Sequence, residues 1–313
     1  MKTYKLVRAK QRSPEWLALR QHGITATDAA VIANLSPYKT PYALWSYKTG
    51  RAVEPPVGEA ALRGTILEPA VAAWYEQTHG VKLRESHGVV VLKRSPWAMA
   101  SLDRTIVGSR GIVEIKTSAS PRWLMGIPDE VQAQVQWQML ITDAPWCDVV
   151  ALLGGLKFEV TRVERDRKYQ ALLFLKCEEW RNRHIIDDVP PAVVGEDSAV
   201  YAEVVPQAND EWTQADGGLE RIASLYSEKV YEAKLLDTEI ADLAMQIKEA
   251  IGDRQGVIGA GWSATWRQNK ASRKVDWQRL AAEQAISADT VNAYTLETPG
   301  ARVFKFKQEA QGE

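Results

Sequence analysis

Three charged residues lie on two short apolar runs of the segment SLDRTIVGSRGIVEIKTS: Asp103, Glu114 and Lys116. Two carboxylates can hold a hard cation such as Mg²⁺, which takes oxygen ligands and retains water. A lysine beside them lowers their repulsion and can orient or deprotonate a water molecule. These residue types suggest metal-assisted hydrolysis, in which the metal polarises a phosphoryl oxygen and activates water. The alternative is an exposed strand face on which Lys116 forms an ion pair with Glu114.

Residues 108–109, Gly-Ser, separate the two runs and are typical of a two-residue hairpin loop with a type II′ turn. Counting outward from this loop places Asp103 opposite Glu114 and Ser101 opposite Lys116. Side chains alternate along a strand, so these four side chains are predicted to share one face. Two opposed carboxylates repel each other unless a cation lies between them. The other face is predicted to carry Leu102, Val113 and Ile115.

The composition excludes several classes of protein. The chain has 313 residues and a net charge of −1, so a nucleic acid could bind only at a local basic patch or a metal cleft. Two cysteines and four histidines are too few for a disulfide framework and supply little for zinc. No signal core and no run of about 18 apolar residues is present, so a cytoplasmic protein is expected.

The elements that must position these residues lie before residue 190. Helices are expected over 12–23, from about 25–28 onward, and over 62–79, 131–140 and 165–185; strands are expected over 87–94, 97–107, 111–117, 147–155 and 157–163. Pro69 predicts a helix boundary or kink at Glu68. The run VQAQVQWQML alternates like a strand, but Gln, Ala, Met and Leu favour a helix. A helix is expected there because the two following runs resemble a hairpin.

The Pro-rich segment DDVPPAVVGED predicts a linker, so we expect domains at 1–190 and 191–313. In the second domain, apolar residues from Leu219 to Ala250 follow steps of three and four, interrupted by Lys229. This seam predicts a long helix that packs on another helix. A basic, Trp-rich segment follows, with Arg267, Lys270, Arg273 and Lys274 as candidate DNA contacts. The alternatives are a strand pair packing its tryptophans on the long helices, and a surface for a partner protein.

Four ordered motifs between 12 and 155 resemble the PD-(D/E)XK nucleases, and within them the YqaJ-like viral recombinase and lambda-exonuclease group. They are LRQHGITATDAAVI, RGTILEPAVAAWYE, ASLDRTI with GIVEIKTS, and EVQAQVQWQML. The resemblance implies an α/β fold with a restriction-endonuclease-like core, a mixed central sheet flanked by helices. The chain would add a C-terminal helical extension, which compact lambda-type enzymes lack.

The resemblance also implies roles for individual residues. Asp103 and Glu114 resemble the metal carboxylates, with the carbonyl of Ile115 as a backbone ligand. Lys116 resembles the residue that positions or activates the water. Glu68 matches the helical acid that assists metal or water binding, and Gln134 matches the catalytic-site glutamine of the QxQ helix. The alternatives are a helix-end charge before a proline for the first, and a solvated helix face for the second.

In lambda-type members, a pocket for a terminal 5′-phosphate uses two arginines and two hydroxyl residues. The matching positions are Arg20, Thr27, Ser101 and Arg122. Arginine binds phosphate oxygens in a bidentate manner, and a helix start near Thr27 offers free N–H groups. Thr27 could equally be an ordinary N-cap, and Arg20 could close the preceding helix. Lys39 is a further candidate DNA contact, whereas core packing is expected for Trp45.

By resemblance, the expected function is a Mg²⁺-dependent 5′-to-3′ exonuclease on linear double-stranded DNA that leaves 3′ overhangs, with Mn²⁺ able to substitute. The expected partners are duplex DNA ends and a single-strand annealing protein, with a ring-like trimer as the assembly and a phage or prophage in a bacterial cytoplasm as the setting. A structure-specific or nicking endonuclease and a non-catalytic DNA-binding accessory protein remain alternatives. A Cas4-like nuclease fits poorly, because it needs four cysteines for its cluster.

Overall fold

The computed structural model describes residues 3–10, 13–56, 58–205, 211–269, 276–284 and 286–295. The chain forms two compact units that divide after Pro206. The division expected from the sequence lies earlier, after residue 190. The reason for the difference is that α7 (Ser198–Val204) packs on the first unit, where the rings of Tyr42 and Tyr201 lie 6.1 Å apart.

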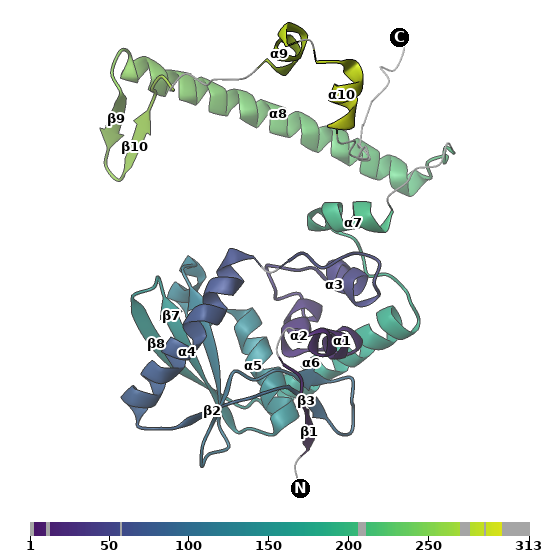
Figure 1. The fold of residues 1–313 in the computed structure, drawn as a ribbon, viewed down its shortest axis with the longest axis vertical. Coiled ribbons are helices and arrows are strands. Elements are labelled where there is room, and N and C mark those ends of the chain that lie inside the picture. Colours follow the sequence, from purple (N-terminus) through teal and green to yellow (C-terminus); the bar gives the residue numbers. More distant parts are fainter. Residues whose placement is uncertain are drawn as a thin grey trace. The chain divides into compact units, whose positions relative to one another are not determined.

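The first unit is built on a mixed sheet with strand order β2-β5-β6-β7-β8 (Figure 1). Its strands are β2 (Leu83–Glu85), β5 (Arg104–Ile106), β6 (Ile112–Ser118), β7 (Trp146–Leu153) and β8 (Lys157–Glu164). β6 and β7 pair in parallel through the crossover helix α5 (Asp129–Thr142), and the other neighbours pair antiparallel. The antiparallel β7–β8 pair is the hairpin expected from the sequence.

Helices cover both faces of this sheet. On one face, α4 (Glu59–His79) buries Val71 and Tyr75 against β6 and β7. On the other face lie α5, α2 (Ala26–Ile32) and α6 (Arg167–Trp180). The predicted fold class, a mixed sheet flanked by helices, is therefore confirmed.

The run VQAQVQWQML is helical, as predicted, and lies in α5. Helix α5 is buried on nearly all sides, so it does not need one apolar face and one polar face. Gln136 and Gln138 are buried along with the apolar residues of the run, and the sequence can therefore alternate like a strand. A boundary or a kink was expected at Glu68, before Pro69; the boundary is wrong, since helix α4 continues through the proline. Burial of Val71, Ala72 and Tyr75 beyond Pro69 outweighs the local preference.

The single strand expected over 97–107 is divided between two sheets. β4 (Met99–Ala100) belongs to a small sheet with β1 (Tyr4–Val7) and β3 (Val89–Leu92), whereas β5 belongs to the central sheet. The link between them does not continue the strand alternation. Leu102 therefore lies in the cluster of α2 and α5, and its predicted position on the face of Val113 and Ile115 is wrong.

The remaining elements of the first unit are α1 (Pro14–His22), α3 (Pro41–Lys48), η1 (Pro121–Met125), η2 (Arg181–Ile186) and η3 (Gly195–Asp197). The second unit contains α8 (Gly217–Ile251), β9 (Gly256–Gly259), β10 (Trp262–Thr265), α9 (Trp277–Glu283) and α10 (Ala288–Ala293). Within the described ranges, every helix is too short or too polar to span a bilayer.

The second unit has the long helix that the apolar seam predicts, α8. Its seam residues are largely exposed, among them Ile222, Leu236 and Ile240, so helix-on-helix packing is not seen within the described part. The predicted strand pair is β9–β10, but Trp262 remains half-exposed. Arg267 is exposed after β10; the other candidate DNA contacts of this unit, Lys270, Arg273 and Lys274, lie outside the described residues.

Candidate active site

Strand β6 and helix α5 supply the centre of the site. Glu114 and Lys116 project from β6 toward α5, whereas Val113 and Ile115 pack on the α4 side. The two-residue spacing on a strand therefore puts the carboxylate and the amine on one face, as predicted. Glu114 is 3% exposed, so neighbouring groups must satisfy its charge.

Hydrogen bonds surround the Glu114 carboxylate. Lys116 Nζ donates to Glu114 Oε1 at 2.6 Å and to Gln134 Oε1 at 2.9 Å. Gln134 Nε2 donates to Glu114 Oε1 at 2.5 Å. Gln138, one helical turn further along α5, donates from Nε2 to Glu114 Oε2 at 2.7 Å and to the carbonyl of Ser101 at 3.1 Å. Gln134 is therefore part of the site, and the interpretation as a solvated helix position does not hold.

Asp103 lies directly before β5, next to Glu114 in the strand register. Arg104 pairs with Val113 and Thr105 with Ile112, which is the predicted register, but the pairing ends there, so the predicted pairs Asp103–Glu114 and Ser101–Lys116 are not part of the ladder. The predicted two-residue loop is wrong, since residues 107–111 form the connection. Ser109 N donates to the Ile106 carbonyl at 3.2 Å, and Gly108 supplies the positive φ of 80° that this turn requires. The longer loop leaves the register unchanged.

Charges in this cluster are unevenly balanced. Burial raises the pKa of Asp103 well above its ordinary value, and repulsion from Glu114 and Glu68 adds to this effect, while Lys116 and the Ile115 N–H oppose it. Burial alone would lower the pKa of Lys116, but attraction by Glu114 and Asp103 raises it above its ordinary value. The carboxylates therefore gather more negative charge than one lysine neutralises.

The open edge of β6 offers oxygen atoms to a cation. Ile115 N donates to Asp103 Oδ2 at 2.8 Å, beyond the last β5–β6 pair. The N–H and C=O of one strand residue point to the same edge, so the Ile115 carbonyl faces the edge where Asp103 lies. Asp103, the Ile115 carbonyl and Glu114 thus present the hard oxygen ligands that suit Mg²⁺. Within the described residues, no group of three acidic, histidine or cysteine side chains has metal-binding spacing.

Glu68 lies on α4 and is bound to an arginine. Its Oε1 accepts from Arg104 NH1 at 2.6 Å, in a partly buried ion pair. Glu68 and Asp103 line one cleft of about 610 Å³. The carboxylate is thus near the site, but Arg104 holds it, and a direct metal contact would require that ion pair to open.

Two of the four predicted phosphate-binding residues meet in the structure. Arg20 NH1 lies 3.5 Å from Ser101 Oγ, and the guanidinium lies 4.3 Å from the centre of the Trp16 ring. Burial lowers the pKa of Arg20, and the charges of Asp28 and Glu54 oppose this shift. The Arg20 side chain is thus turned toward the segment that carries Asp103, rather than serving only to close α1.

Thr27 and Arg122 lie on other parts of the same region. Thr27 is in the first turn of α2, whereas the N-cap is Thr25, so the N-cap interpretation of Thr27 is wrong. Thr27 lines a second cleft of about 310 Å³ together with Lys116 and Gln134. Arg122 on η1 is paired with Glu130 through two bonds of 2.7 and 2.8 Å. That pairing occupies its guanidinium.

Lys39 lies at a cleft, whereas Trp45 lies in the core. Lys39 also lines the 310 Å³ cleft and forms an ion pair with Glu54. Trp45 is 4% exposed and belongs to the core, as expected. The two clefts lie beside the Asp103–Lys116 cluster and are lined by different elements. The 610 Å³ cleft is lined by residues of β5 and α4, and the 310 Å³ cleft by residues of α2, η1 and α5.

Sequence reasoning missed a buried ion pair that joins three helices. Lys48 Nζ at the end of α3 lies 2.9 Å from Asp28 Oδ2 and donates to the carbonyls of Arg20 and Gly23 at 2.9 and 2.6 Å. Asp28 also accepts from Thr25 N at 2.9 Å, completing the capping box of α2. Burial would raise the pKa of Asp28, but Lys48 and Arg20 lower it to about 2. The motif TATD carries the capping-box signal, but nothing local marks Lys48 as its partner.

Comparison with known proteins supports the sequence resemblance. The chain is 31% identical to the uncharacterized protein YqaJ of Bacillus subtilis (strain 168) over 282 residues, which cover 85% of this chain and 86% of the relative. Residues 15–145 match the family described as the YqaJ-like viral recombinase domain. The chain belongs to the YqaJ-like viral recombinase family. Its Asp103–Lys116 hairpin and α5 glutamines lie within the matched region, and membership of this family supports the prediction of a nuclease.

Solved structures give weaker matches. An alkaline exonuclease, LHK-Exo, from Laribacter hongkongensis is 23% identical, covers 63% of this chain and all of its own, and has a TM-score of 0.47. A phage-related exonuclease from Haemophilus somnus 129PT is 10% identical, covers 53% of this chain and 96% of its own, and has a TM-score of 0.42.

Proposed function

We propose that this YqaJ-like protein is a Mg²⁺-dependent deoxyribonuclease that digests linear double-stranded DNA from 5′ ends and leaves 3′ single strands. The observation that carries the proposal is the arrangement of Lys116, Gln134 and Gln138 around Glu114, with Asp103 bonded to the next residue of the same strand. This cluster supports phosphodiester hydrolysis rather than the alternative of an exposed strand face, because Glu114 is buried and both carboxylates are held by hydrogen bonds.

Asp103, Glu114 and the Ile115 carbonyl would hold Mg²⁺, and Mn²⁺ would substitute. When bound, the metal polarises a phosphoryl oxygen and activates a water molecule. Gln138 holds the Glu114 carboxylate and the Ser101 backbone in place, and Gln134 orients the amine of Lys116. Lys116 places a proton donor on the same strand face, where it orients the attacking water.

Metal removal gives a test that does not depend on turnover. Two close carboxylates repel each other without a cation, so adding Mg²⁺ to EDTA-treated protein should raise Tm. In Asp103→Asn this increase should be lost, because one ligand and the repulsion are both removed. We expect EDTA to abolish cleavage and Mg²⁺ or Mn²⁺ to restore it. An equal rise in Tm in wild type and variant would place the metal elsewhere.

Arg20 and Ser101 support recognition of a 5′-phosphate. Arg20→Ala should remove the preference for 5′-phosphorylated over 5′-hydroxyl duplex ends, lowering it at least about tenfold, because a charged hydrogen bond to phosphate is lost. Trp16→Leu should weaken the preference less, since Arg20 loses only the ring that supports it. The measurement is digestion of both substrates, with the Tm increase by Mg²⁺ as a control. An unchanged preference in Arg20→Ala would exclude Arg20 from end recognition.

The full assay compares linear 5′-phosphorylated, linear 5′-hydroxyl and closed circular duplex with Mg²⁺. Degradation of linear DNA alone, with release of 5′ nucleotides, supports the exonuclease. Cutting of circles identifies an endonuclease, and DNA binding without cleavage identifies an accessory protein. By family membership we further propose a phage-type recombination role in the bacterial cytoplasm, with a single-strand annealing protein as partner and a ring-like trimer as the assembly.

A further inference from the structure

A groove of about 540 Å³ lies between the start of α6, the end of α5 and the turn after β3. Three arginines border it, and its floor is apolar. The residues that carry the argument are Arg94, Arg165, Arg167, Leu140, Phe174 and Leu175. No residue that lines it is acidic, and none lines the two clefts of the active site. The groove is therefore a separate surface of the first unit.

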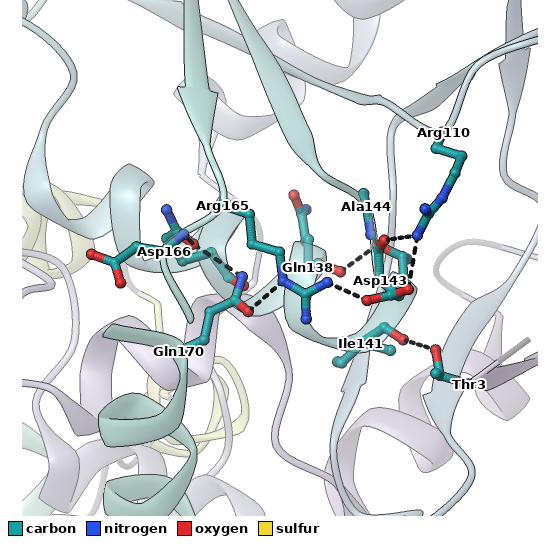
Figure 2. A network of polar contacts seen from close by, with 11 residues as sticks. Thr3, Arg110, Gln138, Ile141, Asp143, Ala144, Arg165, Asp166 and Gln170 are labelled. Carbon is teal, nitrogen blue, oxygen red and sulfur yellow. Dashed lines mark hydrogen bonds and ion pairs between the residues drawn. The ribbon is translucent and has the colours of Figure 1, made fainter. Parts of the chain in front are cut away.

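The arginines leave positive charge in excess. Asp143 forms ion pairs with both Arg165 and Arg110, and Arg165 Nε also donates to Gln170 Oε1 at 2.9 Å (Figure 2). One carboxylate thus balances two guanidinium groups. Arg167, at the first position of α6, adds to the field that lowers the pKa of Asp143, an effect led by the hydrogen bond from Arg165.

Arg94 and Arg167 remain available to a partner. Both are exposed, and neither forms an ion pair with another described residue. The Arg94 guanidinium lies 5.6 Å from the centre of the Phe174 ring, at the edge of the apolar floor. Its donors therefore stand beside an apolar surface, where hydrogen bonds to a carboxylate lose less to competing water.

The floor of the groove is unusual for a phosphate-binding surface. Leu175 is 59% exposed and Phe174 is partly buried beside it. Leu172, one turn earlier on α6 and outside the lining of the groove, is 69% exposed. A DNA backbone would cover these side chains with charged phosphate and gain nothing from them, whereas a peptide can bury a large apolar side chain on leucine and phenylalanine.

We propose that this groove binds an acidic peptide segment of a partner protein that carries one or two large apolar side chains. The apolar side chain packs on Phe174 and Leu175, and flanking carboxylates pair with Arg94 and Arg167. Arg165 also borders the groove, but Asp143 and Gln170 hold its side chain, so it is not assigned to a carboxylate of the peptide. The binding needs neither metal nor DNA cleavage, so it can hold or fail independently of the proposed nuclease function.

The test uses the full chain in EDTA and a fluorescein-labelled ten-residue peptide in which Asp and Glu flank a central Leu-Phe pair. We expect saturable binding by fluorescence anisotropy, weakened at least about tenfold in Arg94→Glu/Arg167→Glu. A similar loss is expected in Leu175→Ser, which changes no charge. Arg183→Glu makes one such substitution, with half that change of charge, at an exposed position outside the groove and should bind as wild type.

Three comparisons can overturn the proposal. A peptide with Ser in place of Leu-Phe should bind much more weakly, and equal binding would show that only charge is recognised. Equal binding by wild type and Arg94→Glu/Arg167→Glu, with both folded by circular dichroism, would exclude the groove. Loss of affinity for a 20-base-pair duplex in that variant, with peptide binding retained, would make the surface a DNA contact instead.

Discussion

Lys116→Met is expected to slow DNA hydrolysis at least about 100-fold, in the range that loss of a positioned proton donor produces. Methionine retains the volume of the lysine stem but removes the bonds to Glu114 and Gln134. Asp103 and Glu114 remain, so Mg²⁺ should still raise Tm. The measurement is the rate of release of acid-soluble nucleotides from linear 5′-phosphorylated duplex, together with the Tm increase.

Lys157→Met is a matched control for this experiment. Lys157 also lies two residues from a glutamate on one strand, with its Nζ 2.9 Å from Glu159 Oε2, but it is exposed on β8. The two variants make the same chemical change in the same local pattern, and the control should retain the wild-type rate. If Lys116→Met kept more than a tenth of that rate, Lys116 would be a structural ion-pair partner and the proposed role would fall.

Lys48→Met is expected to lower the free energy of unfolding of the first unit by about 3–5 kcal/mol. The substitution leaves Asp28 buried without its cation and removes the donor to the carbonyls of Arg20 and Gly23. The measurement is urea unfolding of the full chain followed by tryptophan fluorescence. The same ion pair fixes the end of α1 against α2, so the preference for 5′-phosphorylated ends should weaken as well.

The exposed pair of Lys157 with Glu159 again serves as the comparison, since Lys157→Met should cost at most about 1 kcal/mol. The double variant Asp28→Asn/Lys48→Met should be more stable than Lys48→Met alone, because no unpaired charge is then buried. A loss below about 1 kcal/mol in Lys48→Met would mean that water or a neighbouring group replaces the lysine, and that the pair does not hold the three helices together.

Short-range sequence patterns were sufficient to predict much of the site. The glycine in the β5–β6 loop and the alternation on either side predicted the strand register, because a hairpin pairs residues that are close in the chain. That register places Asp103 beside β6, and the bond from Ile115 N to its carboxylate holds it near Glu114 and Lys116. Helix-favouring residues likewise outweighed alternation in α5, and the order of the motifs indicated the family.

Other features depend on contacts between distant residues. The sequence did not single out Gln138, whose side chain binds Glu114, 24 residues earlier in the chain. It also gave no sign that Lys48 on α3 pairs with Asp28 on α2. Leu102 lies on the opposite side of the sheet from the predicted one because its segment passes from one sheet to another. Helix α4 continues through Pro69 because the residues that follow the proline are buried. Local preferences amount to about 1 kcal/mol per residue, or about 3 kcal/mol for proline in a helix, and burial of several apolar side chains exceeds both. Residue types and spacing therefore defined the chemistry, whereas packing between distant segments decided which groups hold the reacting residues in place.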